Sequence, residues 1–78
     1  MREKTMRFVV TFYTTAEAMA MERLCRAKGI EGKLISAPRS VSADCGIAWS
    51  APADAEQAIR QATQEAELET QGFHRLLL

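Results

Sequence analysis

The sequence predicts an α+β domain of the ferredoxin-like class, a four-stranded antiparallel sheet with two helices on one face. Apolar runs of strand length and two segments of helical periodicity follow the order β-α-β-β-α-β, which is the order of a split βαβ sandwich. With 78 residues the chain is long enough for one modest core. Because strand–helix–strand crossovers are right-handed, both helices are expected on the same side of the sheet.

Composition limits the class of protein. Hydrophobic residues make up 47% of the chain and charged residues 26%, which is typical of a folded globular domain. Ten basic and ten acidic residues cancel, so we expect neither a nucleic-acid partner nor a membrane surface. We expect residues 1–6 to be frayed and residues 7–78 to form a single domain. The charged start lacks a signal-peptide pattern, so we expect a cytoplasmic location.

Four segments have the composition of β-strands. We predict strands at residues 7–13, 33–37, 46–50 and 73–78, rich in β-branched, aromatic or other apolar side chains. Pro38 ends the second strand, since proline has no N–H to donate to a ladder. In the first strand, side chains alternate between a face with Phe8, Val10 and Phe12 and a face with Arg7, Val9, Thr11 and Tyr13.

Both helices carry recognisable start signals. Thr14 and Glu17 form a capping-box pattern, and Gly29 supplies the left-handed residue that ends the first helix. Asp54 is predicted to cap the second helix, with Gln57 in the capping-box position. The expected inward faces are Ala16, Ala20, Leu24 and Ala27 in the first helix, with Met19 and Met21 at its flanks, and Ala55, Ala58, Ile59, Ala62 and Ala66 in the second.

The sheet face without helices is expected to be uncovered. It should contain Val9, Tyr13 and, depending on strand register, either Trp49 or Ala48. An open and partly apolar sheet face commonly marks an interface between proteins. We therefore expect a homodimer or another partner contact on this face.

The connection between the second and third strands contains the residues best suited to chemistry. Residues 37–46 include a cation, two serines, an acid and a cysteine beside a glycine. A thiolate is favoured by nearby cations and backbone N–H groups, which Arg39 and Gly46 are expected to provide at Cys45. Asp44 opposes a thiolate unless its carboxylate points outward. The residue types are equally consistent with an inert, buried thiol at Cys45.

No other residue forms a convincing site. Cys25 is expected on the side of its helix opposite the inward stripe, without a role. His74 is the only histidine and is expected to be a strand residue rather than a general base. Neither cysteine belongs to a Cys-x-x-Cys motif, and the four glycines form no phosphate loop. We therefore expect no metal and no cofactor.

A resemblance to a known family supports a role for Cys45. The residues that carry it are the strand Phe8-Val9-Val10-Thr11-Phe12, the helix Thr14-Thr15-x-x-Ala18-x-Ala20-Met21-Glu22-x-Leu24, Gly29-Ile30, and Pro38-Arg39-x-Val41-Ser42-x-x-Cys45-Gly46. These segments resemble the family called putative selenium/sulfur carrier protein-like. Ser36 stands where members of this family often have the first proline of Pro-x-Pro-Arg.

The resemblance implies a carrier protein rather than a conventional enzyme. Cys45 would hold sulfur or selenium as a persulfide or selenosulfide, loaded by a cysteine desulfurase or a selenocysteine lyase and passed to a protein acceptor. Arg39 would stabilise the anionic sulfur, while Ser42 and the Gly46 amide would orient it. The sequence does not decide between sulfur and selenium.

Two other functions are compatible with the residues. One is a non-catalytic module that binds a protein or a small ligand, which ferredoxin-like domains often do. The other is a redox sensor that forms an intermolecular disulfide through Cys45.

Overall fold

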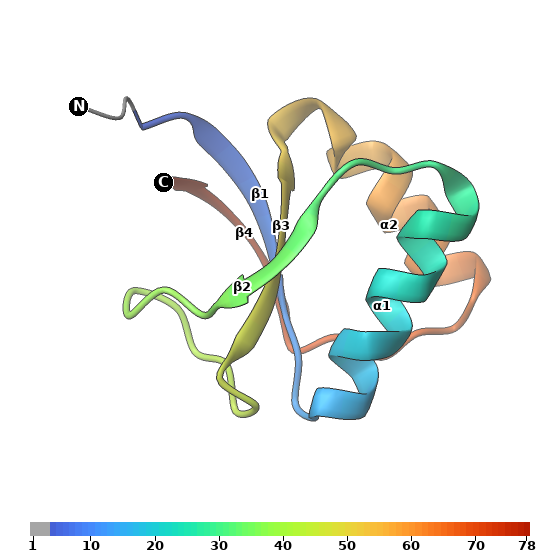
Figure 1. The fold of residues 1–78 in the computed structure, drawn as a ribbon, viewed down its shortest axis with the longest axis horizontal. Coiled ribbons are helices and arrows are strands. Elements are labelled where there is room, and N and C mark those ends of the chain that lie inside the picture. Colours follow the sequence, from blue (N-terminus) through green and yellow to red (C-terminus); the bar gives the residue numbers. More distant parts are fainter. Residues whose placement is uncertain (1–3) are drawn as a thin grey trace.

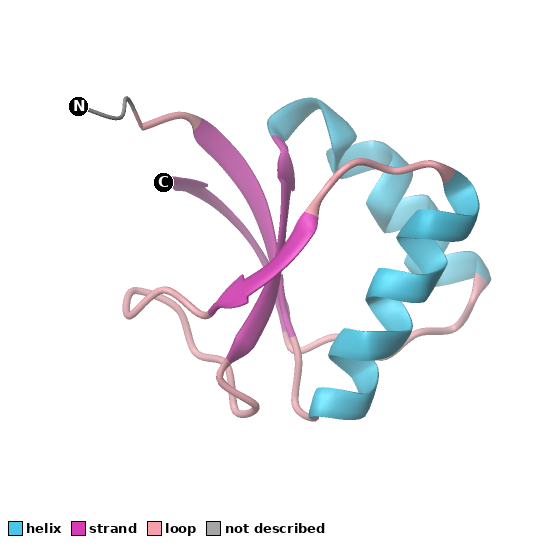
Figure 2. Ribbon diagram, in the orientation of Figure 1, coloured by secondary structure: helices cyan, strands magenta, loops and turns pink. Residues whose placement is uncertain are grey.

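The computed structural model describes residues 4–78 and has the predicted ferredoxin-like architecture (Figure 1). The elements are β1 (Met6–Thr11), α1 (Thr15–Lys28), β2 (Lys33–Ser36), β3 (Ile47–Pro52), the 3-10 turn η1 (Ala53–Ala55), α2 (Glu56–Glu65) and β4 (Gly72–Leu77). The strands form an antiparallel sheet in the order β2-β3-β1-β4. Both helices lie on the same side of this sheet (Figure 2). The fold class and the element order are confirmed.

The ends of the described chain pair with each other. The N–H groups of Thr5 and Leu78 each donate to the carbonyl of the other residue at 3.0 Å, and Met6 is the first residue of β1. Residues 1–6 were expected to be frayed. Residues 1–3 lie outside the described part of the chain, whereas Thr5 is hydrogen-bonded to Leu78 and Met6 belongs to β1.

Local signals set both ends of α1 as predicted. Thr14 is extended, and its side chain accepts a hydrogen bond from the Glu17 N–H at 3.2 Å. The Glu17 carboxylate accepts in return from the Thr14 N–H at 3.2 Å, which completes the capping box. Gly29 ends the helix with a left-handed backbone at φ 71°.

The inward face of α1 differs from the predicted alanine stripe. The buried residues are Ala18, Met21 and Cys25, whereas Ala16 and Ala27 are exposed. The prediction was wrong because both stripes have helical spacing, and the sheet determines which of them faces inward. Burying Met21 and Cys25 removes more apolar surface from water than burying alanines would.

The start of α2 also differs from the prediction. Asp54 is not its cap, because the chain leaves β3 at Pro52 and enters the turn η1 directly. The helix then begins at Glu56 with Ala55 at the cap position and no side-chain cap hydrogen bond. A 3-10 turn in front of a helix continues the backbone geometry of the helix, so no extended cap residue is needed.

The inward face of α2 is only partly the predicted seam. Ile59 and Ala62 are buried as expected, but Ala58 and Ala66 are exposed, and Thr63 is buried. The Thr63 hydroxyl donates to the Ile59 carbonyl at 2.9 Å, which satisfies it inside the core.

The strand register directs Trp49 toward the helices. Trp49 is opposite Val10 on β1 and Leu34 on β2, and it belongs to the hydrophobic core. Gly32 lies against its indole ring, where a Cβ atom would be 2.6 Å from Cε2 and Nε1. The core cluster between sheet and helices consists of Phe8, Val10, Phe12, Ala18, Met21, Cys25, Trp49, Ala51 and Ile59.

The sheet face opposite the helices is more covered than predicted. Val9, Thr11 and Ala48 have no exposed surface, although no helix lies on this side. The connection between β2 and β3 extends toward this side of the sheet (Figure 1). Tyr13, expected on this face, follows β1 and is exposed. The face is therefore not a bare apolar surface.

Candidate functional site

Cys45 lies in a tight turn just before β3. The Gly46 N–H donates to the Ala43 carbonyl at 2.9 Å and closes the turn, while the Ala37 N–H donates to the Gly46 carbonyl at 2.9 Å. Gly46 has a left-handed backbone at φ 77°, a conformation that glycine adopts without strain. These bonds extend the pairing of β2 and β3 up to the turn, so Cys45 has a defined position.

The turn is attached to the rest of the domain on two sides. The Cys45 N–H donates to the Phe12 carbonyl, just after β1, at 3.4 Å. The Asp44 N–H donates to the Gln71 side-chain oxygen at 2.9 Å, and the Gln71 side-chain amide donates to the Asp44 carboxylate at 3.2 Å. Gln71 is itself fixed to β1, because its N–H donates to the Thr11 carbonyl at 2.7 Å.

Cys45 lies at the boundary between the core and the solvent. Cys45 is a free cysteine of intermediate burial that packs against the edge of the hydrophobic core. Its thiol donates to the Ile47 carbonyl at 3.2 Å. An S–H group is needed for this contact, so an anionic sulfur would lose it and face a carbonyl oxygen instead.

The structure brings only some of the predicted site residues together. Asp44 and Gly46 flank Cys45 within the turn, whereas Arg39 and Ser42 are exposed. Among residues 4–78, neither Arg39 nor Ser42 forms a hydrogen bond or ion pair with Cys45. The Gly46 N–H was expected to face the sulfur, and this was wrong, because closing the turn directs it to Ala43.

Gln71 is the residue that the sequence did not reveal. It is one of several polar residues before β4, in a segment with no motif, and its partner Asp44 is 27 positions away along the chain. The Asp44 carboxylate accepts a hydrogen bond from the Gln71 side-chain amide, which partly stabilises its negative charge.

The remaining candidates lie elsewhere. Cys25 is fully buried, and this desolvation raises the pKa of its thiol to about 11. Cys25 was wrongly expected on the outer side of α1. His74 on β4 is paired with Val9 on the neighbouring strand β1, and its Nε2 lies 3.4 Å from the Thr11 hydroxyl. Within residues 4–78 no group of three or more metal-ligating side chains is close enough to hold an ion.

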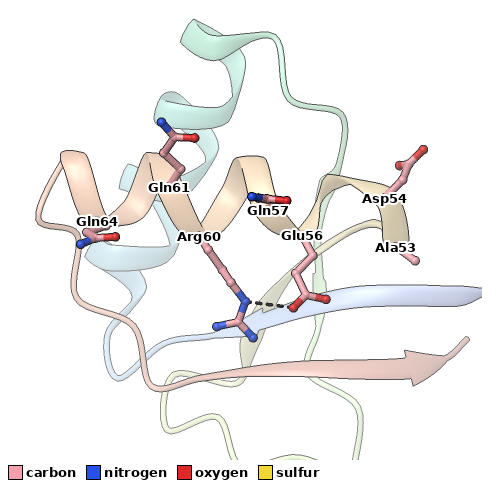
Figure 3. Close-up of a pocket in the computed structure, with 7 residues that line it drawn as sticks. All are labelled: Ala53, Asp54, Glu56, Gln57, Arg60, Gln61 and Gln64. Atoms are coloured by element: carbon pink, nitrogen blue, oxygen red, sulfur yellow. Dashed lines mark hydrogen bonds and ion pairs between the residues drawn. The ribbon is translucent and has the colours of Figure 1, made fainter.

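A cavity lies along α2, beside an ion-pair cluster that includes Glu56 and Arg60. It measures about 630 Å³, and polar side chains of η1 and α2 line it (Figure 3). Glu56 accepts from Arg75 at 2.7 Å and from Arg60 at 2.9 Å, and these bonds lower the pKa of Glu56 to about 2. The Arg60 guanidinium also lies 4.6 Å from the centre of the Phe73 ring. The cluster therefore connects α2 to β4.

Fold and site together define a small ferredoxin-like domain with one partly accessible cysteine, in a turn attached to two strands. Residues 7–75 match the family described as "Putative Se/S carrier protein-like", and the chain belongs to this family. No curated protein and no solved structure shows significant similarity to the chain. Among the described residues, no helix combines the length and the apolar character that crossing a bilayer requires.

Proposed function

We propose that Cys45 carries sulfur or selenium between a donor and an acceptor protein. The observation that supports this proposal best is the position of Cys45, a free and only partly buried cysteine in a defined turn at the edge of the core. Cys25, the other cysteine, is fully buried with a raised pKa and is unsuited to transfer. A carrier needs one reachable thiol and no cofactor.

Loading is a transfer of a sulfane atom between two thiols. The Cys45 thiolate attacks the terminal sulfur of a persulfide on the donor, forming a new S–S bond while the S–S bond of the donor breaks. The donor cysteine leaves as a thiolate, so no external oxidant or reductant is needed. With selenium as the terminal atom, the product on Cys45 is a selenosulfide. A cysteine desulfurase or a selenocysteine lyase supplies the donor in this proposal.

Release follows the same chemistry in reverse. A nucleophile on the acceptor protein attacks the terminal chalcogen, and Cys45 leaves as a thiolate. We propose that Arg39 approaches this anion from the exposed part of the loop, since a guanidinium stabilises a nearby negative charge. Ser42, which is also exposed in this loop, would orient the loaded atom. Both cysteines are free, which fits the cytoplasmic location that we propose.

Mass spectrometry after incubation with a desulfurase and cysteine tests this function. We expect the wild-type chain to gain one sulfur atom, and a selenocysteine lyase with selenocysteine to add one selenium atom. Cys45→Ser should gain neither, while Cys25→Ser should load like the wild type. Equal loading of Cys45→Ser, or no loading of the wild type by either donor, would exclude the proposed role.

A further inference from the structure

The sheet face opposite the helices carries a groove that the transfer chemistry does not use. It has a volume of about 500 Å³ and is lined by residues of β1, β2 and β3, together with Pro38 and the paired ends Thr5 and Leu78. At the centre of this face Ser50 is 3% exposed and its neighbours Val9 and Ala48 are fully buried, so larger side chains cover them. The groove is therefore bordered mainly by the longer side chains that line it, among them Arg7, Lys33 and Ile35.

Two cations border this groove in defined positions. The Arg7 Nε donates to the Ser50 hydroxyl at 3.0 Å, and its Nη2 lies 3.4 Å from the Ser50 carbonyl oxygen. Lys33 is directly opposite Ser50 in the pairing of β2 with β3. Within residues 4–78, neither Arg7 nor Lys33 forms a salt bridge. Their charges are therefore available to a bound anion.

Acidic side chains are absent from the sheet of this neutral chain, although cations also lie on the helices. None of the four strands contains an acidic residue. Every aspartate and glutamate among residues 4–78 lies on a helix, on η1 or in a connection. Two further cations stand next to groove residues in the sequence, Lys4 before Thr5 and Arg39 after Pro38. The groove is therefore complementary to negative charge.

We infer that this groove binds an acidic, extended segment of the protein that loads or unloads Cys45, which deepens the proposed function and depends on it. Pro38 connects the two sites, because it lines the groove and begins the loop that ends at Cys45. A partner held in the groove thereby contacts the start of the connection that leads to Cys45, which itself packs against the core beside Phe12. A second copy of this chain fits less well, since paired faces would bring Arg7 and Lys33 against like charges.

Binding of a fluorescein-labelled oligoglutamate peptide, followed by anisotropy at low salt, tests the groove. The double variant R7Q/K33Q should bind about tenfold more weakly than the wild type. The matched control R23Q/K28Q removes the same net charge from α1 and should stay within about twofold. K33Q alone, at an exposed position, should weaken binding about threefold without affecting the Arg7–Ser50 contact.

Three outcomes would overturn the inference. The first is that R7Q/K33Q and K33Q both bind the peptide as tightly as the wild type. The second is that the control R23Q/K28Q weakens peptide binding as much as R7Q/K33Q does. The third is that the wild type sediments as a dimer and R7Q/K33Q as a monomer. The assay is repeated with Cys45→Ser, which should bind the peptide normally. Peptide binding therefore tests the groove even if Cys45 is never loaded, whereas the mass of the chain after incubation with a donor tests the carrier function.

Discussion

Replacing Gln71 with alanine should release the Cys45 turn. The change removes two hydrogen bonds to Asp44, at 2.9 and 3.2 Å, and leaves the backbone bond of residue 71 to Thr11 intact. At roughly 0.5–1 kcal/mol for each exposed bond, the docked turn loses about 1–2 kcal/mol. This corresponds to about a 5- to 30-fold rise in the population of the open turn.

Alkylation of Cys45 at fixed pH measures this release, because a half-buried thiol reacts mainly from locally opened conformations. We expect the rate to rise about 5- to 30-fold in Gln71→Ala, in a Cys25→Ser background that leaves one reactive thiol. Gln57→Ala, an exposed glutamine on α2, is the matched control and should leave the rate unchanged. An unchanged rate in Gln71→Ala, despite a loss of stability in urea, would refute the role of Gln71 as a positioning residue.

Three further predictions concern the stability of the fold. Gly32→Ala should destabilise the domain by about 2 kcal/mol or more in urea unfolding, because an added Cβ would lie 2.6 Å from the Trp49 indole and the backbone φ is 155°. The fluorescence emission of Trp49 should shift as well. A variant as stable as the wild type would contradict this packing. Glu56 has a pKa lowered from 4.5 to about 2, so its stabilising contribution is complete above about pH 4.5 and is lost as the pH falls toward 2. Thermal unfolding of Glu56→Gln should therefore depend less on pH in this range, and an identical pH profile would show that the ion pairs do not form in solution. Cys25 should react with alkylating reagents only when the domain unfolds, since burial shields its thiol and raises its pKa to about 11. If Cys25 in the folded protein reacted as fast as Cys45, α1 would not bury it against the sheet as described.

Local signals made much of the fold predictable. The capping box of Thr14 and Glu17 and the terminating Gly29 depend on residues within one helical turn, and all of them are confirmed. The order of strands and helices follows from periodicity and therefore also emerged correctly. The inward face of α1 could not be obtained in this way, because the choice between Ala20 and Met21 depends on the shape of the sheet below.

The candidate site was less predictable than the fold. The turn that holds Cys45 depends on the contact between Asp44 and Gln71, whose separation in the sequence carries no periodic signal. Arg39 was expected near the sulfur because it lies in the same loop and belongs to the resembled motif, yet an exposed loop cation need not contact its own loop. The groove at Arg7 and Lys33 becomes visible only once the pairing of the strands is known.

The most direct measurement is the intact mass of the chain after one round of transfer from a desulfurase. If Cys45 is a carrier, the wild type gains a single sulfur that a thiol acceptor then removes, and Cys45→Ser gains none. A chain that stays at its original mass with both sulfur and selenium donors, or that is loaded equally without Cys45, would contradict the account.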